Sequence, residues 1–298
     1  MTTACRSLHQ VPAPAKLNLF LHLVGRRDDG YHLLQSVFML IDWGDSLDFT
    51  RRDDGTLSRE DVGSLALPEN DLCMRAARLL KEVTGTQAGA DIRLHKYLPA
   101  EAGMGGGSSD AATTLLALNR LWGTGMKRQE LMQLGQRLGA DVPFFIAGQN
   151  AWVEGIGERI TPVTLPVQRW VVVKPAHGVS TKTIFSSEKL ARNTKTAIIS
   201  GFAANDTVSD VCPALNVEQM LAEAHNDMEP VARELCPEID HAIKWLGEQG
   251  LKGRMTGSGS AVFAPRGHDR PLASAPPGWT VRECCNLAVH PLRHWCSD

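Results

Sequence analysis

A cluster of glycines and serines is the segment of this 298-residue chain whose composition points most directly to chemistry. Four glycines fall within residues 103–107, and Ser108 and Ser109 follow at once. Glycine tolerates positive φ and lets an anion approach backbone N–H groups, while serine hydroxyls can donate hydrogen bonds or cap a helix. A helix start also carries roughly half a positive charge. The segment therefore predicts a site for a polyphosphate.

A glycine cluster on its own is also compatible with a flexible turn that ends in a serine N-cap. Two better-known phosphate loops are excluded. A Walker A loop requires a lysine after its last glycine, where this chain has Ser108, and a dinucleotide-binding loop requires its third glycine at that same position. The secondary structure expected on either side of the loop distinguishes a flexible turn from a phosphate-binding loop.

The flanking segments have the periodicity of regular structure. Residues 90–97 are expected as a strand, and apolar side chains recur at i, i+4, i+7 and i+11 from Ala111 to Trp122, directly before Gly123. A strand that enters the loop and an amphipathic helix that leaves it favour the phosphate site over the turn.

The rest of the chain alternates between strand-like and helix-like segments, which predicts a mixed α/β or α+β fold. Further strands are expected at residues 15–24, 33–41, 46–50, 169–174 and 261–264. Further helices are expected from Asp71 to Gly85, over residues 131–138, and over residues 239–246 before Gly250. Turns are expected at residues 26–30 and 42–45, and a polar connector at residues 267–277.

The length predicts two domains, at roughly 150 residues per domain. Two prolines interrupt the pattern between Pro162 and Pro166, so residues 1–165 and 166–298 are expected to form the two domains. A cleft is expected between them.

Charge and cysteine usage restrict the partners and the compartment. The chain has 31 basic and 33 acidic residues, a net charge of −2 and no long charge block, so neither nucleic acid nor membrane is an expected partner. No apolar signal or membrane-spanning segment is expected. Seven cysteines without a CxxC pair argue against a disulfide framework or a zinc site and favour the cytoplasm. Small molecules are the expected ligands.

Three motifs together resemble the GHMP kinase superfamily. Residues 99–109 match its phosphate loop, Pro-x-x-x-Gly-Leu-Gly-Ser/Gly-Ser/Gly-Ser, while residues 14–19 and 255–263 look like its N-terminal motif and its C-terminal glycine motif. Within the superfamily, residues 30–33 and 139–145 and the doubled-glycine form of the loop are similar to the diphosphocytidyl-methylerythritol kinases. Asn226–Pro230 is similar to that family's Asn-Asp-Leu-Glu segment.

The resemblance implies a two-domain fold, with an N-terminal ATP domain like domain 2 of ribosomal protein S5 and a C-terminal ferredoxin-like substrate domain. It implies transfer of the ATP γ-phosphate, with Mg²⁺, to the 2-hydroxyl of a cytidine-diphosphate-linked methylerythritol in non-mevalonate isoprenoid synthesis. A monomer or a homodimer is expected.

The resemblance also implies the catalytic residues. Asp141 would take the proton of the acceptor hydroxyl, and Lys16 would lie beside it and keep its carboxylate ionised. The residues alone leave two other roles open: Asp141 as the N-cap of a helix that begins near Pro143, and Lys16 as a solvated surface lysine.

Substrate and ATP contacts are carried over from the family in the same way. Tyr31 would stack on cytosine, His32 would hydrogen-bond to the base edge, Phe185 would supply a second ring and Asn18 would contact the substrate. Phe185 could equally pack in the core, and Asn18 or Lys96 could be an exposed strand residue. The implied ATP contacts are Pro99, Ala100, Glu101, Ala102, Gly103, Met104, Gly105, Gly106, Gly107, Ser108 and Ser109, with Lys96 and Asp71.

The chain departs from the family pattern at three of these positions. Asp71 stands where the family has Asn, which leaves the adenine contact open, and Met104 replaces the usual Leu. Glu101 would repel phosphates and is expected to point to solvent. No carboxylate cage for Mg²⁺ is visible, so no metal ligand is assigned. Two rival functions stay open: another enzyme of the superfamily, such as a mevalonate or homoserine kinase, and a nucleotide-binding sensor without catalysis.

Overall fold

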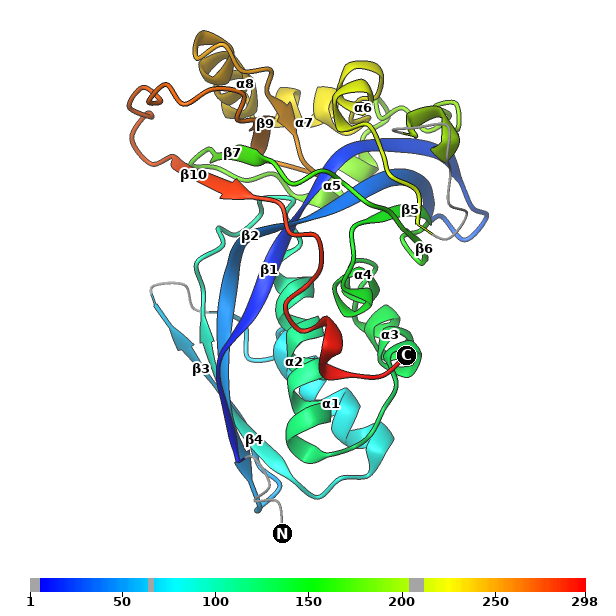
Figure 1. The fold of residues 1–298 in the computed structure, drawn as a ribbon, viewed down its shortest axis with the longest axis vertical. Coiled ribbons are helices and arrows are strands. Elements are labelled where there is room, and N and C mark those ends of the chain that lie inside the picture. The colour runs from blue at the N-terminus through cyan, green and yellow to red at the C-terminus, as the bar shows by residue number, and fades with distance from the viewer. Residues whose placement is uncertain (1–5, 64–66, 204–211) are drawn as a thin grey trace.

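The computed structural model describes residues 6–63, 67–203 and 212–298, and within these it places two β-sheets along the long axis of an elongated molecule (Figure 1). The strands are β1 Ser7–Arg26, β2 His32–Arg52, β3 Leu57–Val62, β4 Gly89–His95, β5 Ala151–Gly155, β6 Arg159–Pro162, β7 Arg169–Lys174, β8 Arg254–Met255, β9 Val262–Pro265 and β10 Thr280–Cys285. The helices are α1 Leu72–Thr84, α2 Gly106–Trp122, α3 Arg128–Leu138, α4 Val142–Ala147, α5 Thr181–Ser186, α6 Val217–Glu223, α7 Glu229–Leu235 and α8 Glu238–Glu248, with short 3₁₀ turns η1 Ile199–Phe202 and η2 Arg293–Trp295. The expected mixed α/β architecture is confirmed.

The first sheet is organised around the long strand β2. On one side β2 pairs with β1 over most of its length. On the other side it pairs with β5 through Leu34–Phe38 and with β4 through Ser46–Arg52. Strand β3 lies parallel to β4, as a crossover through α1 requires. Strand β2 therefore continues across the whole sheet, from its pairing with β5 to its pairing with β4.

Helices α1 to α4 cover one face of this sheet (Figure 1). Several of their limits follow signals expected from the sequence: Asp71 caps α1 by accepting from Met74 N at 3.0 Å, and Gly85 and Gly123 end α1 and α2 with positive φ. The side chains that α2 turns to the sheet are buried among apolar residues of β2, β4 and α1. Burial of this face fixes the helix start that carries the glycine loop.

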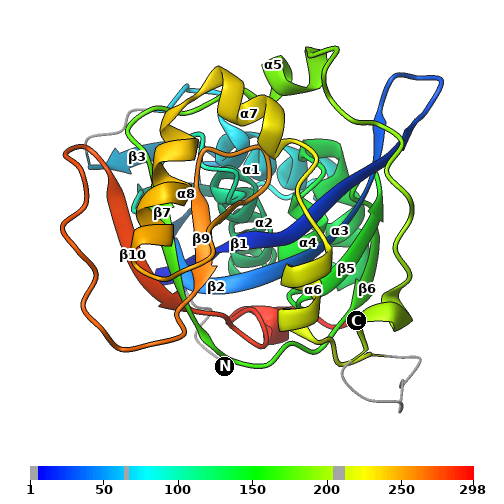
Figure 2. The same cartoon turned by 90° about the horizontal axis from the view of Figure 1, so that it is seen from above.

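The second sheet has the antiparallel order β10-β7-β9-β8, with α7 and α8 lying over it (Figure 2). The first sheet ends at Pro162 and the second begins at Arg169, on either side of the expected boundary at residue 165. The chain then returns to the first half, where Arg128 N donates to Ser297 O at 2.8 Å. The division into residues 1–165 and 166–298 therefore stays a prediction.

The turn expected at residues 42–45 is wrong, because these residues continue β2. A Cβ on Gly44 would overlap with the carbonyl oxygen of Ala13 on the paired strand, so glycine here reflects close packing of β1. Asp45 is buried, and its carboxylate accepts from Tyr97 N at 2.6 Å. Gly44 and Asp45 are residue types that favour turns, but here they contact parts of the chain that are distant in sequence.

The other expected strands and helices are found, with two differences in their limits. Strand β1 begins at Ser7, eight residues before its predicted start, and the strands expected at residues 33–41 and 46–50 form the single strand β2. Strand β3 was not foreseen, because the charged residues at its centre hide the pattern of an edge strand. Among the described residues the six cysteines are free, and Cys5 lies outside them. No helix in the described part of the chain has the length and apolar character needed to cross a membrane.

Candidate active site

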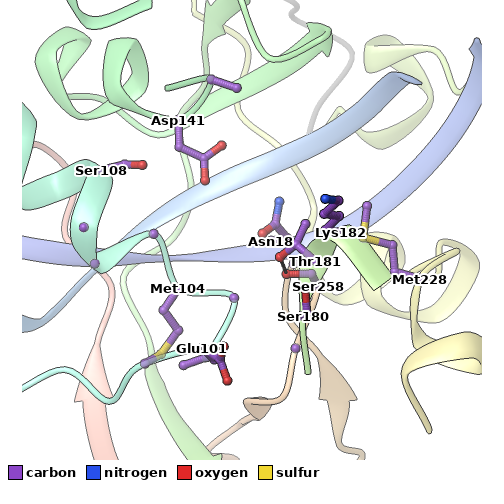
Figure 3. A pocket seen from close by; sticks show the side chains of 18 of the residues that line it. Asn18, Glu101, Met104, Ser108, Asp141, Ser180, Thr181, Lys182, Met228 and Ser258 are labelled. Atoms are coloured by element: carbon purple, nitrogen blue, oxygen red, sulfur yellow. Dashed lines mark hydrogen bonds between the residues drawn. The ribbon is translucent and has the colours of Figure 1, made fainter. Parts of the chain in front are cut away.

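A cleft of about 1270 Å³ brings together β1, the glycine loop, the start of α4, the α5 segment and the turn between β8 and β9 (Figure 3). Every predicted site residue except Ser109 lines it. These residues are Lys16, Asn18, Tyr31, His32, Asp71, Lys96, Pro99, Ala100, Glu101, Ala102, Gly103, Met104, Gly105, Gly106, Gly107, Ser108, Asp141 and Phe185. Segments far apart in the sequence therefore meet at one place.

Helix α2 begins without a side-chain cap. Its N-cap is Gly105, with φ 71°, and no side chain hydrogen-bonds to the first N–H groups. The serine N-cap considered from the sequence is therefore wrong, because Ser108 and Ser109 lie within the first turn. Ser109 Oγ instead donates to Pro14 O at 2.7 Å and ties the helix to β1. The free N–H groups and the helix dipole give this end the properties of an anion site.

The glycine loop is held from both sides by backbone hydrogen bonds. Lys16 N, in β1, donates to Met104 O at 3.0 Å. On the opposite side, Ser260 N donates to Glu101 O at 3.1 Å. The Glu101 residue is exposed, as expected from its charge. The loop therefore has a fixed shape before any ligand binds.

The turn between β8 and β9 supports the same loop. A Cβ on Gly103, whose φ is 71°, would overlap with the carbonyl oxygen of Thr256, so the two glycine motifs pack backbone against backbone. Thr256 Oγ1 accepts from Asn18 N at 2.8 Å, and Asn226 Nδ2 donates to Gly257 O at 2.8 Å. The N-terminal motif, the C-terminal motif and the Asn226 segment thus meet in one hydrogen-bonded cluster.

Lys16 and Asp141 lie close together, as predicted. Lys16 Nζ is 3.6 Å from Asp141 Oδ2, also donates to Asn18 Oδ1, and lies 4.7 Å from the centre of the Phe38 ring. Because Lys16 is only 4% exposed, the alternative of a solvated surface lysine is wrong. Burial lowers the pKa of the Lys16 ammonium, and the charge of Asp141 partly opposes this effect. The pair therefore joins a buried ammonium to a carboxylate that is open to the cleft.

The same pair also adjoins the glycine loop. Asp141 occupies the N-cap position of α4, but its side chain makes no capping hydrogen bond and points into the cleft (Figure 3). A Cβ on Gly105 would lie 3.2 Å from Lys16 Cε, so the lysine passes directly beside the phosphate loop. A carboxylate, an ammonium and an anion site therefore share one end of the cleft.

Lys96 lies beneath the loop within a buried ionic cluster that the sequence did not reveal. Its Nζ contacts Asp45 and donates to Asp110 Oδ2 at 2.8 Å, and a Cβ on Gly106 would lie 3.6 Å from it. Burial, with the nearby charge of Asp45, raises the pKa of Asp110 to about 8 although Lys96 opposes the shift. The burial of Lys96 lowers its own pKa, but the two carboxylates outweigh it and leave the pKa raised.

Asp71 has a structural role in addition to its place in the cleft wall. Its carboxylate caps α1 and forms an ion pair with Arg59. The carboxylate is thus engaged by the protein itself.

Aromatic side chains form the other end of the cleft. Tyr31 is 60% exposed, in the turn between β1 and β2. His32 stacks on the half-buried Phe185 with ring centres 4.8 Å apart and an angle of 21° between the planes. Sequence reasoning did not find Arg192, which donates to His32 Nε2 at 3.0 Å from a segment without recognisable periodicity.

Comparisons with known proteins agree with this geometry. The family described as "GHMP kinases N terminal domain" matches residues 71–149, and "GHMP kinases C terminal" matches residues 213–270. The 4-diphosphocytidyl-2-C-methyl-D-erythritol kinase of Variovorax paradoxus (strain S110) is 57% identical over 98% of this chain and 100% of its own length. Its counterpart in Paracidovorax citrulli (strain AAC00-1) is 57% identical over 98% of this chain and 99% of its own.

A solved structure shows the same fold. The crystal structure of a 4-(cytidine 5'-diphospho)-2C-methyl-D-erythritol kinase has a TM-score of 0.68 and 31% identity, and the match covers 92% of this chain and 98% of that one. These matches cover 92% or more of this chain. The chain therefore belongs to the 4-diphosphocytidyl-2-C-methyl-D-erythritol kinase family of the GHMP kinases.

Proposed function

We propose that this GHMP kinase transfers the γ-phosphate of ATP to the 2-hydroxyl of 4-diphosphocytidyl-2-C-methyl-D-erythritol, giving the 2-phosphate and ADP in non-mevalonate isoprenoid synthesis. The observation that carries the proposal is the Lys16–Asp141 pair, with 3.6 Å between Nζ and Oδ2, directly beside the uncapped start of α2. Phosphoryl transfer requires an aligned acceptor and neutralisation of the charge that develops on the transferred group. This end of the cleft supplies groups for both.

In the proposed reaction, the N–H groups at the start of α2 and the glycine loop hold the triphosphate. Asp141 Oδ accepts the proton of the acceptor hydroxyl, and the oxygen attacks the γ-phosphorus in line as the bond to the ADP oxygen breaks. The Lys16 ammonium stabilises both the Asp141 carboxylate and the developing alkoxide. Asn18 orients Lys16 through its side-chain oxygen.

At the opposite end, Tyr31 and Phe185 flank the cytosine, and His32 hydrogen-bonds to the base. Stacking of a base on an aromatic ring contributes about 1–3 kcal/mol, which is enough to select a cytidyl group when two rings take part. Lys96, near Gly106, and Asp71, at the start of α1, lie on the ATP side of the cleft. The Asp71 carboxylate is already engaged by Arg59, so we assign to it a positioning role for the adenine pocket.

Mg²⁺ fits this site as an ion held mostly by phosphate oxygens and water. The described residues contain no group of three or more His, Cys, Asp or Glu side chains arranged to hold a metal. Ser108 and Asp141 line the cleft and offer hydroxyl and carboxylate oxygens, which suit a hard cation. When bound, Mg²⁺ would offset the negative charge of the β- and γ-phosphates.

We further propose that the protein works in the cytoplasm as a monomer or a homodimer. Free cysteines throughout the described residues and a small-molecule substrate support the compartment.

A substrate panel tests the proposed function. The purified chain is incubated with ATP, Mg²⁺ and, in turn, the cytidyl substrate, mevalonate, homoserine and galactose, and products are identified by ³¹P NMR and mass spectrometry. We expect turnover with the cytidyl substrate and a new phosphomonoester on its 2-oxygen. Turnover of another alcohol in its place would support a different GHMP kinase. Binding of ATP without transfer to any alcohol would support the sensor.

A further inference from the structure

Arg192 connects the two elements that form the aromatic end of the cleft. Its Nη2 donates to Ser187 O at 2.7 Å and to Phe185 O at 3.2 Å, and its Nη1 donates to Leu190 O at 3.1 Å. Its Nε donates to His32 Nε2 at 3.0 Å, across 160 residues of sequence. One guanidinium therefore ties the carbonyl end of α5 to the first residue of β2.

The direction of the bond to His32 fixes the proton on that ring. A guanidinium carries five N–H donors and no acceptor, so His32 Nε2 must offer its lone pair. A neutral imidazole with a free lone pair on Nε2 carries its hydrogen on Nδ1. Burial, followed by the charges of Arg192 and Arg26, lowers the pKa of His32 and keeps the ring neutral. Among the described residues, Nδ1 has no hydrogen-bond partner.

The orientation of the ring is set by the same residue. The His32 ring stacks on Phe185, and Arg192 contacts both residues, the first through Nε2 and the second through its carbonyl oxygen. His32 and Phe185 line the cleft, and Arg192 contacts both of them without lining it. A ligand at this end therefore meets a ring with a fixed plane and a fixed donor.

We propose that Arg192 is a positioning residue, which holds His32 against Phe185 as a neutral hydrogen-bond donor, so that this end of the cleft offers one fixed donor to an acceptor on the edge of the base. Cytosine offers two neighbouring acceptors, O2 and N3, to such a donor. This inference rests on the proposed function, because it names the feature of the cytidyl group that the site recognises.

Nitrogen NMR of the full chain tests the proton position without any turnover. The ¹⁵N shifts of His32, assigned by their loss in H32Q, distinguish hydrogen on Nδ1 from hydrogen on Nε2. We expect hydrogen on Nδ1 in the wild type, redistribution toward Nε2 in R192Q, and an intermediate state in R192K, since lysine keeps a donor but lacks the planar fork. K195Q is the matched control: it removes a charge from the same segment at an exposed position and should leave the His32 signals unchanged.

Steady-state kinetics provides the second measurement. R192Q should raise the KM for the cytidyl substrate about 5- to 10-fold, the effect of one misdirected hydrogen bond, with kcat and the KM for ATP changed less than about twofold. R192K should recover part of the loss, and K195Q should match the wild type. A wild-type ring with hydrogen on Nε2, or an unchanged KM in folded R192Q, would overturn the inference.

The inference can still be tested if a variant does not fold or if the wild type is inactive. If R192Q does not fold, the wild-type tautomer and the KM of R192K still test the inference. If the wild type fails to phosphorylate the cytidyl substrate, the proposed function is wrong, whereas the NMR measurement continues to report on Arg192 alone.

Discussion

The two ends of the cleft are built in different ways. At the phosphate end, Lys16, Ser109 and Asp110 are almost completely buried. The glycine loop there is held by backbone hydrogen bonds from β1 and from the turn before β9. At the base end, Tyr31 is 60% exposed and Phe185 belongs to a helix of six residues. In the proposed reaction, the chemistry is therefore placed on the core of the fold, whereas recognition of the base is placed on a turn and a short helix.

This difference indicates how each end of the cleft should respond to substitution. Groups that stabilise a transition state must not reorganise during the reaction, and a buried, cross-linked framework meets this requirement. Rings that clamp a base can tolerate a more exposed setting, because stacking is broad in geometry. Substitutions at the phosphate end should thus affect kcat or folding, and substitutions at the base end should affect KM.

The largest expected effect belongs to Asp141→Asn. The amide keeps the size of the carboxylate but cannot accept the acceptor proton, so kcat should fall roughly 100- to 10,000-fold with little change in the KM for either substrate. The measurement is steady-state kinetics, with thermal denaturation to show that the variant is folded. A kcat within about threefold of the wild type would remove Asp141 from the proposed reaction.

The next effect is structural and compares two glycines of one loop. Gly103→Ala places a Cβ against the Thr256 carbonyl at positive φ and should lower the free energy of unfolding by about 2 kcal/mol or more. Gly107→Ala is the matched control, because its Cβ would meet only Leu72 Cδ1 at 3.5 Å. The unfolding free energy of G107A should stay within about 0.5 kcal/mol of the wild type. Equal losses in denaturant titrations would show that the clamp on the loop is unimportant.

At the base end, Tyr31→Ala should act on binding alone. Loss of one stacking ring should raise the KM for the cytidyl substrate about 5- to 150-fold, with kcat and the melting temperature nearly unchanged. Tyr97→Ala is the matched control, since this other tyrosine is 63% exposed and does not line the cleft. If Y31A lowers kcat as strongly as it raises KM, the proposed separation between the two ends fails.

The last effect, which is the smallest when it is taken per pH unit, concerns the pH dependence of stability. The folded-state pKa of Asp110 is about 8 against an ordinary value of 3.8, so between these values the folded chain holds a proton that the unfolded chain releases. Stability should therefore fall as the pH rises from about 4 to about 8, by at most about 1 kcal/mol per pH unit, and level off above. Asp110→Asn, which is neutral throughout, should flatten this decline in denaturant titrations. Parallel curves for the two proteins would contradict the raised pKa.

The sequence predicts well what short-range contacts determine. The helix limits at Asp71, Gly85 and Gly123 depend on capping within a few residues, and each was foreseen. The glycine loop was placed correctly between a strand and a helix for the same reason. The pairing of Lys16 with Asp141 came from resemblance to the family, because nothing in either residue's neighbourhood along the chain indicates the other.

Long-range contacts explain what the sequence did not predict. Asp42 looks like a turn residue, but its carboxylate accepts from Cys285 N at 2.9 Å, more than 240 residues away. Asp45 and Asp110 form one cluster around Lys96 although 65 positions separate them, and local spacing carries no trace of it. Arg192 likewise acts on His32 from a segment without a periodic pattern. Such residues become visible only when the sheet brings their elements together.

The uninterrupted course of β2 also sets a molecular length. His32 opens this strand at the base end, and Phe38, further along it, lies under the Lys16 ammonium. At about 3.3 Å per residue the two positions are roughly 20 Å apart, comparable to a nucleoside diphosphate extended by a short polyol. In the proposed binding mode, an alcohol without the nucleotide could reach Lys16 or His32 but could not span both, so the strand itself would discriminate between substrates by their length.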